Sequence, residues 1–265
     1  MALRTVGGAV LALPNLPTYS VTTNTTITLS SGDAAYTLTP VGAPAQMGII
    51  YCHPLGGTGN EITSDLVCQQ LARWGFPVIG ALDGGMSSWG NDASRTCMDA
   101  KLAYLAASQG ADASHVALYS ISMGGATALS WAQAHLGIIN FYACLAGVAS
   151  VQTFHDQQSA LSINAAYGGL AGWNAAAATH DPLQIAQANH LTGLRGKMWI
   201  GSTDTVIDAP TSPAALQTAV PGLDILTYTY GAGGHFDIVY IDPVSVATAI
   251  ARSYAPTAAL FAPLA

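Results

Sequence analysis

Ser122 lies between a predicted strand and a predicted helix, in a turn that could expose its hydroxyl as a reactive group. Residues 115–121 form a mainly apolar run typical of a strand, and the small residues after Met123 lead into a predicted helix. A sharp turn from strand to helix holds its serine at a positive φ, which requires small neighbours, and Ser120 and Gly124 meet that requirement. The first N–H groups of the helix then point toward the place where an oxyanion forms. The stretch therefore predicts a nucleophilic serine.

The segment from Ser120 to Gly124 resembles the Gly-x-Ser-x-Gly nucleophile elbow of the α/β-hydrolase family, in which a strand, a sharp turn and a helix follow one another. Ser120 replaces the first glycine, and the family tolerates other small residues at that position. Short motifs of this kind also occur in serine- and glycine-rich turns that carry no chemistry. The rest of the chain has to decide between these two interpretations.

The family's catalytic residues follow the order serine, acid, histidine along the chain. Ser122, Asp204 and His235 have this order, and each follows a predicted strand. The family's Gly-x-x-Asp pattern beyond the penultimate strand implies Asp204 as the acid, with Gly201 as its glycine, and Asp208 is the competing acid. Two glycines precede His235 and supply a loop that can offer its imidazole to Ser122. The resemblance implies a Ser-Asp-His triad.

The same resemblance implies an oxyanion hole made of two main-chain N–H groups. One comes from Met123, the residue after the nucleophile, and the other from the loop that follows His53. Pro54 has no N–H and is excluded. The family's His-Gly-x loops map the second donor onto Leu55, with Gly56 as the second choice. His53 itself is interpreted as a residue that shapes the loop.

Three large side chains are candidates for the walls of a substrate pocket. Trp89, Met86 and Trp173 lie in predicted loops and in the insertion near the triad, and small-molecule sites are lined by apolar and aromatic groups. Ordinary core packing is the alternative for each. Asp83 follows an earlier strand and is interpreted as a residue that hydrogen-bonds its own glycine turn.

The composition limits the classes of function. The 265 residues, 51% of them hydrophobic, can bury one large core, and we expect a single domain. The net charge is −7, from 14 acidic and 7 basic residues without a basic cluster, which argues against nucleic acids and anionic membranes as partners. No apolar run reaches about 18 residues, so no transmembrane helix is expected. No metal-ligand spacing occurs, so neither a metal nor another cofactor is expected.

The four cysteines and the first residues leave two questions open. Cys52 and Cys144 fall in apolar runs and are expected to be buried thiols, whereas Cys68 and Cys97 fall in predicted helices, where a disulfide stays open. The opening residues resemble a signal peptide only faintly, because no convincing cleavage site follows them. The location of the protein stays open, and secretion or association with a virion are both compatible with the sequence.

The pattern of apolar residues alternates between strands and helices, which predicts a mainly parallel sheet with right-handed crossovers and helices on both faces. An arm and antiparallel hairpin strands are expected in about residues 1–44, and a small cap after the sixth strand in about residues 147–194. The other expected strands lie near 47–52, 76–82, 115–121, 138–146, 197–201 and 225–230, and the expected helices near 60–74, 93–108, 123–135, 213–220 and 244–254.

The resemblance covers the chain from about Met47 to the closing helix and is greatest to the dienelactone-hydrolase, acyl-peptidase and esterase branches. It implies the α/β-hydrolase fold and a serine hydrolase that cleaves small carboxylic esters through an acyl-enzyme. A peptidase or a thioesterase with the same triad is one alternative. Another is an inactive module with a binding or structural role in a virion or at a cell surface. The oligomeric state stays open.

Overall fold

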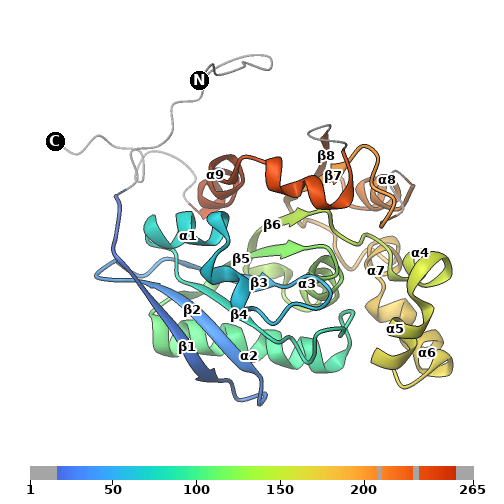
Figure 1. The fold of residues 1–265 in the computed structure, drawn as a ribbon, viewed down its shortest axis with the longest axis horizontal. Helices are drawn as coiled ribbons and strands as arrows, with labels where there is room; N and C mark the ends of the chain where they lie inside the picture. The colour runs from blue at the N-terminus through green and yellow to red at the C-terminus, as the bar shows by residue number, and fades with distance from the viewer. Residues whose placement is uncertain (1–16, 208–210, 229–232, 255–265) are drawn as a thin grey trace.

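One mixed sheet forms the centre of the molecule (Figure 1). The computed structural model describes residues 17–207, 211–228 and 233–254, and within them the sheet has eight strands in the order β1-β2-β4-β3-β5-β6-β7-β8. The first two strands pair in an antiparallel manner at one edge, as expected, and β3 to β8 are parallel. The predicted α/β class is confirmed. The strands are β1 (Val21–Thr28), β2 (Ala34–Pro40), β3 (Met47–Cys52), β4 (Val78–Ala81), β5 (Asp112–Ile121), β6 (Ile139–Leu145), β7 (Gly196–Gly201) and β8 (Leu223–Tyr228).

Helices cover both faces of this sheet, and Figure 1 shows α1 and α9 on the side opposite to α2. The helices α2 (Asp92–Gln109) and α3 (Gly124–Ala132) pack on one face, and α1 (Leu66–Arg73) and α9 (Pro243–Tyr254) pack on the other. Alternate residues of β3 divide between the two cores: Ile50 and Cys52 enter the first, whereas Ile49 and Tyr51 enter the second. Burial on both faces explains why this strand is a nearly continuous apolar run.

The two cysteines whose pairing was left open lie on opposite faces of the sheet. Cys68 belongs to α1 and Cys97 to α2, so the sheet separates their thiols. All four cysteines of the chain are free and buried. They act as small apolar side chains.

The prediction of a single helix from Asn60 to about residue 74 is wrong. The segment contains a short 3-10 helix, η1 (Asn60–Thr63), and then α1, which begins only at Leu66. The carboxylate of Asp65 accepts the N–H of Cys68 at 2.8 Å and so satisfies one of the free donors at the helix start. The sequence predicts Asn60 as the cap, whereas the observed cap, Asp65, lies five residues later.

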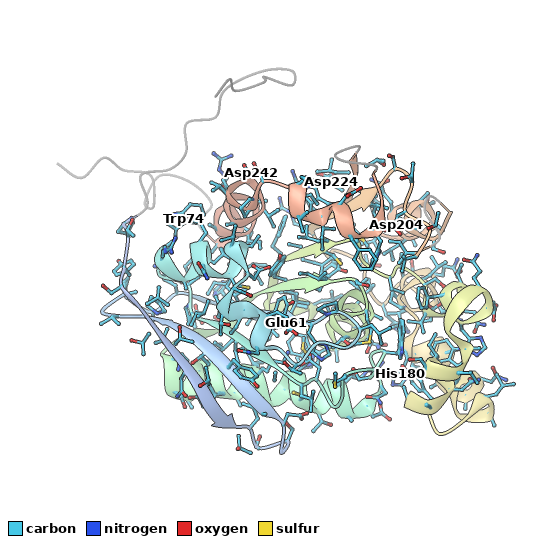
Figure 2. All side chains as sticks on the ribbon, in the orientation of Figure 1. Glu61, Trp74, His180, Asp204, Asp224 and Asp242 are labelled. Atoms are coloured by element: carbon cyan, nitrogen blue, oxygen red, sulfur yellow. The ribbon has the colours of Figure 1, made fainter. Side chains whose placement is uncertain are left out.

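The segment between β6 and β7, residues 147–194, is helical and is called the cap segment below. Figure 2 labels His180 at the end of helix α6 (Leu170–His180), and its Nε2 lies 3.0 Å from the carboxylate of Asp92 at the start of α2. Asp181, between α6 and α7, accepts the N–H of Val151 at the start of α4 at 2.6 Å. The helices are α4 (Val151–Phe154), the π-helix η3 (His155–Ser159), α5 (Ala160–Ala166), α6 (Leu170–His180) and α7 (Pro182–Gln187).

The buried carboxyl of Asp181 makes the stability of the protein depend on pH. Burial raises its pKa from the ordinary 3.8 to about 6. Between these values the folded protein keeps a proton that the unfolded chain has lost, so the contribution of Asp181 to the free energy of unfolding falls as the pH rises from about 4 to 6 and is level above that range. We expect a fall of about 1–3 kcal/mol from this group.

The variant Asp181→Asn should lack this part of the fall, because its amide oxygen still accepts the Val151 N–H but does not titrate. Urea unfolding of both proteins at pH 4, 5 and 6.5 measures the difference, and titration of the other carboxyl groups cancels in the comparison. Parallel curves for the two proteins would contradict the prediction.

Candidate active site

Ser122 lies in the sharp turn between β5 and α3. Its φ is +51°, which confirms the positive value expected for the turn. Its N–H donates to the carbonyl of Leu145 in the neighbouring strand β6 at 2.9 Å and so anchors the turn. A side chain at Gly124 would place Cβ 2.2 Å from the carbonyl oxygen of Cys52, so only glycine fits where α3 passes the end of β3.

The structure brings the three side chains of the expected triad together. His235 Nε2 lies 3.0 Å from Ser122 Oγ, and His235 Nδ1 lies 2.8 Å from Asp204 Oδ2. The histidine is 7% exposed and the aspartate 4%, so this hydrogen-bonded chain is shielded from water except at the serine. The arrangement can remove the proton of the serine hydroxyl and stabilise the resulting imidazolium.

Asp204, the candidate acid, lies in the loop after β7, and Figure 2 labels it. Its Oδ1 accepts the N–H groups of Val206 at 2.9 Å and Ile207 at 3.1 Å, which leaves Oδ2 for His235. A Cβ at Gly201 would lie 2.1 Å from the carbonyl oxygen of residue 233, so this glycine permits the close approach of the acid and histidine loops. The competing acid, Asp208, lies outside the described residues.

The main chain near Ser122 distinguishes between the two candidates for the second oxyanion donor. The N–H of Gly56 donates to the carbonyl of Met86 at 2.8 Å and is therefore occupied. Within the described residues, the N–H groups of Leu55 and Met123 form no hydrogen bond with another main-chain group. The geometry favours Leu55 over Gly56 as the partner of Met123.

A cavity of about 270 Å³ opens at Ser122 and His235. Apart from these two side chains its lining is apolar, so it suits an uncharged substrate. A second cavity, of about 200 Å³, lies between β7, β8 and α8 (Thr211–Ala219) and has no titratable side chain in its lining. The cavity at the triad is lined by Pro54, Leu55, Trp89, Ile121, Ser122, Phe154, Val206, His235, Phe236 and Ile238.

Of the three expected pocket walls, only Trp89 lines the cavity. Its side chain is 1% exposed, and its ring centre lies 4.9 Å from that of Phe154 at the end of α4. The indole N–H donates to Ser162 Oγ of α5 at 2.8 Å, and the Trp89 carbonyl accepts the hydroxyl of Tyr167 at 2.9 Å. Contacts with the cap segment thus hold this wall in place.

The structure does not bring Met86 and Trp173 into the cavity lining. The side chain of Met86 is 49% exposed, and this residue contributes only its carbonyl group, to Gly56. Trp173 is fully buried within the cap segment, where its indole N–H donates to Gln152 Oε1 at 3.0 Å. Its ring packs against Tyr167, because that face of α6 points into the cap segment.

Several lining residues were not expected from the sequence. Phe236 directly follows His235, and Val206 lies two residues after Asp204, so closeness to the triad in the chain is a signal that could have identified both. Phe154 lies more than thirty residues from each triad member, and no signal in the sequence points to it. Its position depends on how the cap segment packs.

Within residues 17–207, 211–228 and 233–254, no group of three or more histidine, cysteine, aspartate or glutamate side chains is arranged to hold a metal ion. No helix in the same part of the chain is long and apolar enough to cross a membrane.

Comparison with known proteins finds similarity in structure but not in sequence. No protein family and no curated protein matches the sequence. Esterase B from Lactobacillus rhamnosis, with a bound inhibitor, superimposes with a TM-score of 0.68 at 16% identity, covering 88% of this chain and 86% of that one.

Two other solved structures agree with that likeness. The substrate-bound fluorophosphonate-binding serine hydrolase F of Staphylococcus aureus has a TM-score of 0.66 at 13% identity, covering 90% of this chain and 99% of that one. An S-formylglutathione hydrolase from Agrobacterium tumefaciens has a TM-score of 0.64 at 14% identity, covering 88% and 93%. At these identities the likeness shows a shared fold.

Proposed function

We propose that this chain, which has the α/β-hydrolase fold, is a serine hydrolase that cleaves carboxylic esters through an acyl-enzyme. The observation that carries the proposal is the hydrogen-bonded chain from Ser122 through His235 to Asp204, with the serine facing an apolar cavity. The esterases and serine hydrolases among the structural neighbours support it.

In the acylation step, His235 Nε2 takes the proton of Ser122 Oγ as the oxygen attacks the carbonyl carbon of the ester. The carbonyl oxygen becomes an oxyanion and accepts hydrogen bonds from the N–H groups of Met123 and Leu55. The intermediate collapses when the carbon–oxygen bond to the alcohol breaks and His235 returns the proton to that alcohol. Asp204 stabilises the imidazolium throughout.

In the deacylation step, water replaces the alcohol. His235 removes one proton from the water as its oxygen attacks the acyl carbon, and the same oxyanion donors bind the second intermediate. Breaking the bond to Ser122 Oγ releases the carboxylic acid, and His235 returns the proton to the serine. The cycle needs only these side chains, two main-chain donors and water.

The cavity supports uncharged acyl groups of short to medium length as the substrates. Its lining contains no acidic or basic side chain other than His235, so it offers no anchor for the charged ends of a peptide. The volume of about 270 Å³ and the packed rings of Trp89 and Phe154 in its wall leave little space for a long acyl chain. Both features favour small esters over peptides and long lipids.

The preference for acyl length is tested with acetyl, butyryl, octanoyl and palmitoyl esters and with aminoacyl anilides. We expect kcat/KM to be highest for butyryl or octanoyl, and Trp89→Leu to move the optimum to a longer chain because it removes part of the cavity wall. Trp173→Leu is the matched control, since this tryptophan is equally buried but lies away from the cavity. An optimum at palmitoyl in the unmodified enzyme, or anilides cleaved as fast as esters, would refute this substrate class.

A further inference from the structure

A buried ammonium group outside the cavity lining takes no part in the steps above. Lys101 is on α2 and its side chain is fully buried. Its Nζ lies 2.5 Å from Asp83 Oδ1 and donates to the carbonyl oxygen of Tyr51 at 2.7 Å. Lysine is rarely buried completely, because removing its charge from water is costly unless it is paired. A role for this side chain is therefore expected.

The two partners of Lys101 lie at the ends of neighbouring strands. Tyr51 is near the end of β3, just before residues 53–57, called the oxyanion loop here because it contains Leu55. Asp83 follows β4 and begins residues 83–91, called the tryptophan loop because it contains Trp89. One ammonium group thus connects the starting points of the two loops that form one side of the cavity.

These two loops also contact each other directly. The Gly56 N–H donates to the Met86 carbonyl at 2.8 Å, which joins the middle of one loop to the middle of the other. His53 is fully buried, and its ring nitrogens lie 2.8 Å from the carbonyl oxygen of Leu82 and 2.7 Å from that of Pro54. The direction of the intervening Leu55 N–H therefore depends on where the tryptophan loop sits.

Two residues of the tryptophan loop lie in the left-handed region. Asp83 has a φ of +56°, which aspartate adopts more readily than most residues, and Trp89 has a φ of +51°, which is rare for a bulky side chain. The carboxylate of Asp83 is held by Lys101. The second carboxylate oxygen of Asp83, Oδ2, makes no hydrogen bond within the described residues and lies 4.0 Å from His53 Nε2.

The electrostatics of the pair keep the lysine charged. Burial by itself lowers the pKa of Lys101, but the carboxylate of Asp83 raises it, and the net direction is upward from the ordinary value. Besides His53, the thiol of Cys97 also lies near this carboxylate, with Sγ 3.8 Å from Asp83 Oδ1. Lys101 is thus the main partner of a carboxylate that would otherwise be buried without compensation.

We propose that Lys101 is a positioning residue, whose ammonium group holds the oxyanion loop and the tryptophan loop together so that the Leu55 N–H points at the oxyanion. The effect of Lys101 on the rate of ester hydrolysis rests on the proposed esterase function. Its effect on the order of the two loops does not depend on that function. The effect on the rate and the effect on loop order can therefore be tested separately.

The main variant is Lys101→Met combined with Asp83→Asn, which removes both charges and leaves no buried carboxylate unpaired. Asparagine is one of the residues that best tolerates a positive φ, so the backbone at position 83 is preserved. The control is Leu105→Ala on the same helix. Leu105 is also fully buried, but as an apolar side chain it forms neither an ion pair nor a hydrogen bond with the two loops. Its truncation destabilises the core.

The first readout is hydrogen–deuterium exchange of the full chain, followed by mass spectrometry of peptides that cover residues 53–57 and 83–91. In the double variant we expect exchange in both loops to be faster on the order of tenfold or more, a loss of local protection of the kind that mobile loops show. Peptides from β5 and β6 should keep their exchange rates. In Leu105→Ala the two loops should exchange no faster than the rest of the molecule.

The second readout is steady-state hydrolysis of a butyryl ester and the rate at which a fluorophosphonate modifies Ser122. Removing one oxyanion donor outright costs about 10²–10³ in kcat, so loosening that donor should cost on the order of 10- to 100-fold. KM should stay within about twofold, because the donor acts on the transition state. Leu105→Ala should keep kcat near that of the unmodified enzyme.

Loop exchange that is unchanged in the double variant, or that rises equally in Leu105→Ala, would overturn the proposed role of Lys101. Faster loop exchange with unchanged kcat would overturn its catalytic part, the positioning of the Leu55 N–H. An unmodified protein that neither cleaves esters nor reacts with the fluorophosphonate would instead refute the esterase function. In that case the exchange data still decide whether Lys101 holds the loops.

Discussion

Replacing Ser122 with alanine should lower kcat for ester hydrolysis on the order of 10⁶-fold, as removal of the nucleophile does in a comparable triad. Ser122 is the serine whose hydroxyl lies within hydrogen-bond reach of His235, at 3.0 Å, and at the mouth of the apolar cavity. Without its oxygen no acyl-enzyme can form. The fold should remain, because alanine keeps Cβ and the main-chain N–H that anchors the turn.

Ser120→Ala is the matched control two residues away. Its side chain is fully buried, and its hydroxyl donates to the Ala143 carbonyl at 3.4 Å and interacts with the side chains of Tyr142 and Cys144. We expect kcat to change little in this variant. Steady-state kinetics on a butyryl ester and peptide mapping of fluorophosphonate-treated protein measure both effects.

The labelling experiment distinguishes the esterase from an inactive module. The fluorophosphonate should modify Ser122 in the folded protein and leave Ser120 untouched, because Ser120 has no base beside it. Modification of a different serine would contradict the assignment of the nucleophile. No modification of any serine would favour a binding or structural role for the chain.

Replacing Asp204 with asparagine should lower kcat on the order of 10⁴-fold, again by comparison with a known triad. In the unmodified protein, the main-chain N–H groups of Val206 and Ile207 donate hydrogen bonds to Asp204 Oδ1. They will hold the amide oxygen of asparagine in that place and turn its NH₂ group toward His235 Nδ1. The histidine then carries its proton on Nε2 and cannot accept one from Ser122.

Asp208→Asn is the control for the acid, and we expect a mild effect. This residue lies outside the described residues, so the comparison of the two variants decides between the acids on function alone. kcat and KM for both variants on the same ester are the measurement. Equal losses, or a larger loss for Asp208→Asn, would move the role of the acid to Asp208.

The local parts of the site were predictable from the sequence. A turn that forces a positive φ at Ser122 requires small residues within a few positions, so the residues next to Ser122 in the sequence indicate the turn. The apolar runs of the central strands are equally local, because burial on both faces favours apolar residues at nearly every position. The order of Ser122, Asp204 and His235 was visible through its resemblance to a family pattern.

Contacts between distant segments were not predictable in this way. Whether Leu55 or Gly56 has a free N–H depends on the carbonyl of Met86, which lies thirty residues further along the chain. Trp89 and Trp173 look alike in the sequence, but one lines the cavity and the other fills the cap segment, since the packing of α4 to α6 decides which ring each one meets.

The fold class and the sharp turn at Ser122 could thus be predicted from the sequence, because each depends on neighbours along the chain or on a strict period of apolar residues. The cavity walls, the main-chain N–H of Leu55 that has no main-chain acceptor and the pairing of Lys101 with Asp83 arise from contacts between distant segments. In the sequence, a buried lysine in a helix cannot be distinguished from an exposed one. Its burial and its partner exist only once two strand ends and a helix are packed together.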